Sequence, residues 1–180
     1  MTPTETAAMT APGVEVDAGE IERVRRRMLN PFLMRAFMLA KMPLGLFAGL
    51  RLSALDAERC ETTVPYGWRS TNPFRSIYFA AQSMAAELST GALAMLAVEL
   101  APAPVAMLIT SLEGGFTKKA TARVTFTCEE GEKVFAAVRR AVETGEPATA
   151  RVETVGRMAD GTEVSRFVFN WSFKKRTPQA

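Results

Sequence analysis

The chain has 180 residues, of which 48% are hydrophobic and 23% charged, which is enough for one domain with a sizeable buried core. Its net charge of +3 is mild, and no dense basic run carries interleaved aromatic residues, so nucleic-acid binding is not indicated. The absence of histidine excludes Ser-His-Asp triads, Cys-His pairs and histidine-based metal sites.

Any proton transfer would therefore fall to Asp, Glu, Lys, Tyr, Cys or water. Cys60 and Cys128 lie far apart in the chain and match no metal-binding spacing, so we expect neither a metal site nor a cofactor. Both cysteines are typical of small core residues in a reducing compartment. The first residues lack the basic-then-apolar pattern of a signal peptide, which favours a cytoplasmic location.

The N-terminal part of the chain is expected to hold a disordered tail and two helices. Residues 1–13 are small, polar and proline-containing, and residues 14–176 are expected to form one domain. Asp17 and Glu20 resemble a capping box that opens a helix over 17–29, and Pro31 begins a second helix running to about Lys41. This basic amphipathic pair fits an anionic membrane surface, although such segments more often dock on their own domain or on a partner subunit.

Two short strands are predicted next, over 46–55 and 58–66. In the second, Cys60, Thr62 and Val64 alternate with more polar neighbours, as in a half-buried strand. A long helix then lies within Asn72–Leu100, with the Asn-Pro pair as a cap or turn and the helix proper starting near Ile77 or Tyr78. Apolar residues occupy nearly all of its faces, which predicts a buried helix, and its polar residues argue against a membrane span.

Glu87 stands in the middle of this helix, where a buried helix normally carries another apolar residue. Two interpretations remain open. Glu87 is either a structural residue, paired or turned to solvent, or a carboxylate with a raised pKa that acts as acid, base or nucleophile.

The second half of the chain reads as four strands and one helix. VAMLITSL (105–112) is a buried strand, Glu113-Gly114-Gly115 is a bulge or turn, and TARVTFTC (121–128) is a second strand. Residues 129–144 form an amphipathic helix that ends at Gly145. The last two strands form a hairpin around Asp160-Gly161, and the second of them places four aromatic residues on one face: Phe167, Phe169, Trp171 and Phe173.

This order predicts an α+β fold in which a curved, mostly antiparallel sheet of about six strands wraps one long helix, with N-terminal helices and one inserted helix. It resembles the hotdog fold. Asn72 and Glu87 are fifteen positions apart, as are the Asn and the acid in the motif of the phenylacetyl-CoA thioesterase-like branch. Tyr78, Phe79 and Ala80 occupy the positions of the His-Gly-Gly sequence in that motif. With this Tyr-Phe-small pattern, the chain most resembles an uncharacterised bacterial branch of the superfamily.

The resemblance implies an acyl-CoA thioesterase. Glu87 would be the general base or nucleophile, the Ala80 N–H would polarise the thioester carbonyl, and Asn72 would position water or that carbonyl. Phe79 would line or narrow the acyl tunnel, and Tyr78 keeps a polar donor where the family has histidine. The alternative is a hotdog module that binds an acyl chain or acyl-CoA without hydrolysing it.

The resemblance also implies a homodimer, or a dimer of dimers, because hotdog subunits pair their sheets edge to edge. Glu87 and Asn72 would then line one apolar pocket at the subunit interface, with Tyr78 at its mouth and the acid supplied by the partner. Four basic residues are candidates to meet the phosphates of CoA: Arg69, Arg75, Lys118 and Lys119. Each of them also fits a merely solvated surface position.

Overall fold

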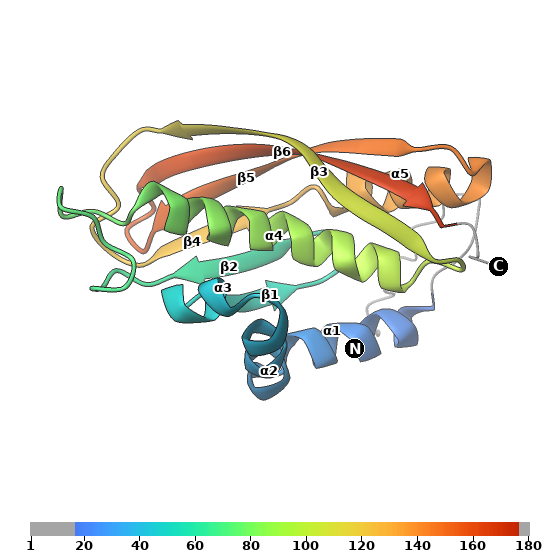
Figure 1. Ribbon diagram of the computed structural model, residues 1–180, viewed down its shortest axis with the longest axis horizontal. Helices are drawn as coiled ribbons and strands as arrows, with labels where there is room; N and C mark the ends of the chain where they lie inside the picture. Colours follow the sequence, from blue (N-terminus) through green and yellow to red (C-terminus); the bar gives the residue numbers. More distant parts are fainter. Residues whose placement is uncertain (1–16, 177–180) are drawn as a thin grey trace, which may run out of the picture.

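The computed structural model describes residues 17–176, and it shows one antiparallel sheet curved around a single long helix (Figure 1). The expected tail over 1–13 and the first residues of the expected domain lie outside the described residues. The helices are α1 (Ala18–Leu29), α2 (Pro31–Lys41), α3 (Pro43–Ala48), α4 (Phe79–Glu99) and α5 (Gly131–Thr144). The strands are β1 (Arg51–Leu55), β2 (Cys60–Val64), β3 (Val105–Phe116), β4 (Val124–Cys128), β5 (Ala148–Met158) and β6 (Glu163–Lys175).

The six strands are ordered β1-β2-β4-β5-β6-β3, and every neighbouring pair is antiparallel. The predicted α+β class and the sheet of about six strands are confirmed. β3 follows α4 in the chain and returns to the far edge beside β6. Its other side pairs with no strand among residues 17–176.

α4 lies close to the sheet because the side chains it turns toward the strands are small. Ala85, Ala86 and Ala92 are almost fully buried. Hydroxyl groups then connect the helix to three strands. Thr62 of β2 donates to the Ala85 carbonyl (2.5 Å), Ser89 and Thr154 of β5 share a hydrogen bond (2.8 Å), and the Trp171 indole of β6 donates to Thr90 (3.1 Å). These bonds satisfy buried polar groups and fix the position of the helix on the sheet.

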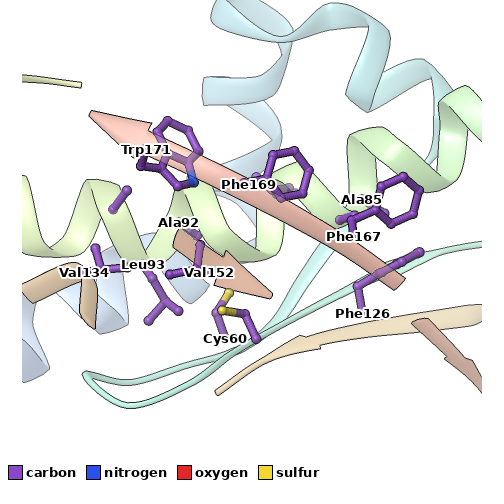
Figure 2. Close-up of a cluster of buried hydrophobic side chains, with 14 of the residues drawn as sticks. Cys60, Ala85, Ala92, Leu93, Phe126, Val134, Val152, Phe167, Phe169 and Trp171 are labelled. Atoms are coloured by element: carbon purple, nitrogen blue, oxygen red, sulfur yellow. The ribbon is translucent and has the colours of Figure 1, made fainter. Parts of the chain in front are cut away.

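The core is formed where the aromatic face of β6 meets α4, as Figure 2 shows. Phe167, Phe169, Trp171 and Phe173 are all buried, which confirms their predicted period of two. The hairpin before them turns at Gly161 with φ of 83°, and the Thr162 carbonyl accepts from the Met158 N–H (3.0 Å). A glycine suits this turn because a positive φ is strained for residues with a side chain.

Cys60 and Cys128 lie opposite each other on β2 and β4, and both are free thiols in the core. Burial raises the pKa of the Cys60 thiol well above its ordinary range and that of Cys128 to about 11. They act as small apolar side chains, as the sequence indicates.

Three predicted elements are wrong in detail. The strand over 105–112 is not buried, because β3 lies at the edge of the sheet: only Val105 is in the core, and Leu108 and Leu112 are 66% and 51% exposed. Residues 46–50 do not belong to a strand, because Pro43 sets the first turn of α3 and Gly49 ends it with φ of 80°. The apolar run LGLFAGL does not alternate, so its pattern does not distinguish strand from helix. Residues 113–115 form no turn but continue β3, and its irregularity lies between Ile109 and Ser111. The packing at position 114 requires a glycine, because a Cβ there would lie 2.8 Å from the Phe167 ring.

The N-terminal helices cover the β1 side of the molecule, and α1 and α3 also contact α4 (Figure 1). α2 packs through Met38, whereas Phe32 and Leu33 are exposed. The predicted apolar surface of this helix is therefore only partly used within the subunit.

Within residues 17–176, no helix combines the length and the apolar character that a membrane crossing requires.

The junction between β1–β2 and α5 depends on Gly131. Its N–H donates to the Glu58 carbonyl (2.9 Å), and a Cβ built on it would lie 2.0 Å from the Ala57 carbonyl oxygen. Because backbone and not a mobile side chain fills that space, we expect Gly131→Ala to lower the free energy of unfolding by about 2–3 kcal/mol. Gly67→Ala, where a Cβ would meet nothing within 4 Å, should change it by less than about 1 kcal/mol. Urea unfolding of both variants checks this, and equal midpoints would contradict it.

Candidate functional site

A cavity of about 840 Å³ opens at the N-terminal end of α4, between the loop that precedes the helix and the end of β3. Five residues singled out in the sequence line this cavity, namely Asn72, Tyr78, Phe79, Lys118 and Lys119. The chain brings them together from two distant segments, because β3 runs back along β6 and places residues 116–120 beside the start of α4. Ala80, Glu87 and Arg75 are not among the lining residues.

Asn72 shapes the loop before α4. Its Oδ1 accepts hydrogen bonds from the Phe74 N–H (3.0 Å) and from the N–H and hydroxyl of Ser76 (3.3 Å each). Its own N–H donates to the Ser76 carbonyl (3.0 Å), and Arg75 is held at a φ of 58°. This is the Asx-type turn expected of asparagine, so Asn72 organises the loop and does not cap the helix, whose cap residue is Tyr78.

The first turn of α4 carries backbone donors that find no acceptor in the described part of the subunit. The Tyr78 N–H donates to Ser70 and the Gln82 N–H to Tyr78, whereas the N–H groups of Phe79, Ala80 and Ala81 have no acceptor among the described residues. The helix has neither a side-chain cap nor an acidic residue in its first turn. These donors, with the positive end of the helix dipole, can stabilise a developing oxyanion.

Gln82 lines the cavity but was missed in the sequence. It is buried, its amide donates to the Ile77 carbonyl (3.1 Å), and its carbonyl accepts from the Ser165 hydroxyl (2.8 Å). The signal available in the sequence was an amide on an otherwise apolar helix. Phe116 also lines the cavity, half exposed and edge-to-face with Phe167, but only the pairing of β3 with β6 brings it there.

Glu87 lies about two turns from the N-terminal end of α4. It belongs to a half-buried stripe of the helix that also carries Ser83, Met84 and Met95. The helix is thus less completely buried than its composition predicts. Burial raises the pKa of the Glu87 carboxyl above its ordinary value, and neither a hydrogen bond nor a nearby charge within the described residues offsets this effect. Among residues 17–176 the carboxylate has no hydrogen-bond or ion-pair partner, so pairing is not observed there, whereas a position turned to solvent still fits the half-buried side chain.

Gly91 makes room for this carboxylate. A Cβ on Gly91 would lie 2.8 Å from Glu87 Oε1 and 3.5 Å from Trp171 Cζ2. Trp171 lies opposite Ile109 of β3 in the sheet register. Glu87 therefore faces the β6–β3 side of the molecule, toward the free edge of the sheet.

The predicted phosphate-contacting residues lie in different places. Lys118 and Lys119 border the cavity, and Lys119 Nζ donates to the Phe74 carbonyl (3.4 Å). Arg75 lies in the loop, with no side-chain contact that points to a ligand. Arg69 does not border this cavity. Its side chain packs beside Gly49, where a Cβ built on that glycine would lie 3.3 Å from Arg69 Nη2, and it lines a different cavity. The structure therefore brings together two of the four predicted residues.

A six-stranded antiparallel sheet wrapped on one long helix, with an open cavity at the start of that helix, defines a hotdog-fold protein. The chain matches the family described as a domain of unknown function, DUF4442, over residues 32–173, and it belongs to this family. A comparison with functionally curated proteins gives no match.

Solved structures with the same fold include proteins described as thioesterases. A Pseudomonas aeruginosa protein of unknown function has a TM-score of 0.67 at 18% identity, covering 83% of this chain and 99% of its own. A mutant thioesterase from the same species has a TM-score of 0.60 at 17% identity, with 82% and 96% covered. The E. coli PaaI protein of the phenylacetic acid degradation operon has a TM-score of 0.55 at 11% identity, with 80% and 91% covered. At these identities the similarity shows the fold alone.

Proposed function

We propose that this protein is an acyl-CoA thioesterase in which Glu87 acts as the general base or nucleophile. The observation that carries the proposal is the Glu87 carboxylate itself, which lies on an apolar helix, without a partner among residues 17–176, next to a glycine that makes room for it. A carboxylate in such surroundings costs stability, and a raised pKa is typical of residues that transfer protons near neutral pH. The thioesterases among the fold relatives support the same reaction class.

The reaction would use Glu87 and the first turn of α4 together. As general base, Glu87 would take a proton from water while the water oxygen attacks the thioester carbonyl. The resulting oxyanion would be stabilised by the unused N–H of Ala80, and the CoA thiolate would leave. As nucleophile, the carboxylate would attack the same carbonyl directly and form an anhydride that water then cleaves.

One subunit does not bring these two groups together. Ala80 and Glu87 are seven residues apart on one helix, which is about 10 Å along its axis. We therefore propose that the acid of one subunit serves the helix N-terminus of its partner in a homodimer. The free edge of β3 is the surface that supports this assembly, because Leu112 and Phe116 are half exposed on the same sheet face as the buried Phe169 and Phe167. The cavity borders this edge, so a second copy placed there would lie beside it.

The cavity also fits the proposed substrate. Its wall carries Ile77, Phe79 and Phe116, which suit an acyl chain, and Lys118 and Lys119 supply positive charge for phosphates.

The free buried cysteines fit a reducing compartment, which supports a cytoplasmic location.

Acyl-CoA binding should weaken as salt is added. Because Lys118 and Lys119 are exposed, their attraction to phosphate is screened over about 10 Å at 0.1 M ionic strength. The Kd measured by calorimetry should rise with sodium chloride, and changing both lysines to glutamine should flatten this dependence. Lys174→Gln, an exposed lysine on β6, should leave it unchanged. A Kd independent of salt would indicate that these lysines do not meet the phosphates.

The second candidate function is a module that binds acyl-CoA without hydrolysing it. It is favoured by Phe79 and Ala80, which add side chains where the related motif has glycines that admit a close approach. Release of free CoA thiol from acyl-CoAs of increasing chain length separates the two candidates. Turnover by the purified protein supports the enzyme, whereas saturable binding without turnover supports the module and ends the enzymatic proposal.

A further inference from the structure

A second cavity, of about 630 Å³, lies between α2, α3 and the β1 edge of the sheet. It shares no lining residue with the cavity at the start of α4. Its inner wall is apolar and includes Met34, Leu46 and Leu52. It therefore has the form of a separate ligand site and is not an extension of the proposed thioesterase site.

Four arginines surround this cavity, and no acidic residue of the described part of the chain, 17–176, lines it. They come from four separate parts of the chain: Arg35 lies on α2, Arg51 on β1, Arg69 in the loop after β2, and Arg123 immediately before β4. None of the four forms an ion pair with an acidic residue within 17–176. Four like charges around one opening repel one another, so an anion bound there would relieve the repulsion.

The sheet register places two of these arginines on one surface. Arg51 lies opposite Thr63, and Thr63 lies opposite Thr125, so these side chains share a face. Thr62 and Phe126 point the other way, into the core around α4. Arg123 is two residues before Thr125 and falls on the same outer face. Arg51 and Arg123 are thus positioned on the side opposite α4.

Aromatic side chains extend the apolar wall to the rim. Phe47 lines the cavity and is half exposed, and Trp68, 81% exposed, meets it edge to face at 5.9 Å. Exposed aromatic rings beside arginines suit a ligand that has both an apolar chain and a charged head. A free inorganic anion would use the arginines and leave the apolar wall uncovered.

We infer that this cavity binds a single-chain anionic amphiphile, with the chain against α2 and α3 and the carboxylate or phosphate head among the four arginines. Arginine suits both heads, because its guanidinium donates two parallel hydrogen bonds to either. This inference does not depend on the proposed thioesterase activity, since neither Glu87 nor Ala80 lines the cavity.

Calorimetric titration with dodecanoate, dodecyl phosphate, dodecanol and inorganic phosphate tests the inference. Dodecanoate or dodecyl phosphate should bind, and whichever binds more tightly identifies the head group. The double variant Arg51→Gln/Arg123→Gln should weaken that binding by about tenfold or more, because each lost contact is charge-assisted. Arg140→Gln, an exposed arginine on α5, is the matched control and should have no effect.

Two further variants keep the result unambiguous. Met34→Glu, which places an acid on the apolar wall, should also weaken binding, and Glu87→Gln should not. Equal affinity for dodecanol and dodecanoate would overturn the inference, as would equal affinity for inorganic phosphate, which would indicate an adventitious ion only. Association with anionic vesicles in the absence of any binding to monomeric dodecanoate or dodecyl phosphate would replace the cavity site with a membrane-surface one.

Discussion

Replacing Glu87 with glutamine is expected to reduce the kcat of acyl-CoA hydrolysis by about 100-fold or more, since an amide neither accepts the proton nor attacks the thioester. The side chains are almost equal in size, so Gly91 still has room beneath the new amide. Glu132→Gln on α5, an exposed glutamate that forms no ion pair with any described residue, is the matched control and should keep the wild-type rate. The measurement is release of free CoA thiol under saturating substrate.

The pH dependence follows from the direction of the Glu87 pKa. Burial raises this pKa above the ordinary value of 4.5, and only the ionised carboxylate is active, so kcat/KM should increase with pH through the raised pKa. Stability should change in the opposite direction. A carboxyl whose pKa is raised by folding stabilises the protein below its unfolded pKa and loses that contribution as the pH rises through the folded value.

Glutamine stays neutral at every pH, so Glu87→Gln should raise the Tm at pH 8 and have little effect near pH 4. Loss of activity together with a gain in stability is the combination expected of a functional carboxylate. A lower Tm for Glu87→Gln at pH 8 would mean that the carboxylate is held by a partner, and a wild-type rate would end its role in catalysis.

The sequence predicted the parts of the fold in which local pattern and tertiary environment agree. The period-two aromatic face of β6 was predicted correctly because a strand buried on one face carries apolar residues at every second position. The turn at Gly161 was predicted correctly because a positive φ favours glycine. Residues 46–50 were wrong because a short apolar run lacks a period, and the decisive signals were Pro43 and Gly49 at its ends.

The candidate site could be predicted only where its residues are neighbours in sequence. Asn72, Tyr78 and Phe79 surround one cavity because they share one loop and helix start. Phe116 was missed because β3–β6 pairing, which no local pattern records, brings it to the cavity. The side-chain hydrogen bonds of Asn72 point to a different task from the one that the resemblance implies, since its Oδ1 is already occupied by Phe74 and Ser76. Its proposed catalytic role, like that of Ala80, stays a prediction.

A heterodimer built from two inactive subunits is expected to recover about half of the wild-type turnover per dimer, because one of its two sites would be intact. One subunit carries Glu87→Gln. The other carries Ala80→Pro, which removes the proposed oxyanion donor. Residue 80 lies in the first turn of α4, where a proline removes an N–H that has no intrahelical acceptor. Ala80→Gly keeps the N–H and is the matched control, which should remain active.

The recovery depends on which subunit supplies the acid. If Glu87 serves the partner's helix N-terminus, the unchanged acid of the Ala80→Pro subunit meets the unchanged donor of the Glu87→Gln subunit. If both groups act within one subunit, each site of the heterodimer lacks one of them and no activity returns. The heterodimer is obtained by co-expression with two affinity tags, and its mass is measured by light scattering.

Leu112→Asp tests whether β3 carries this assembly. An aspartate on that half-exposed position would place charge on the proposed interface of both copies, so the variant should be monomeric and inactive even with Glu87 and Ala80 unchanged. Leu44→Asp, at an exposed position on α3, should stay dimeric and active. A dimeric, active Leu112→Asp protein would exclude the β3 edge. A wild-type monomer that still hydrolyses acyl-CoA would mean that substrate runs along α4 from Ala80 to Glu87 within one subunit.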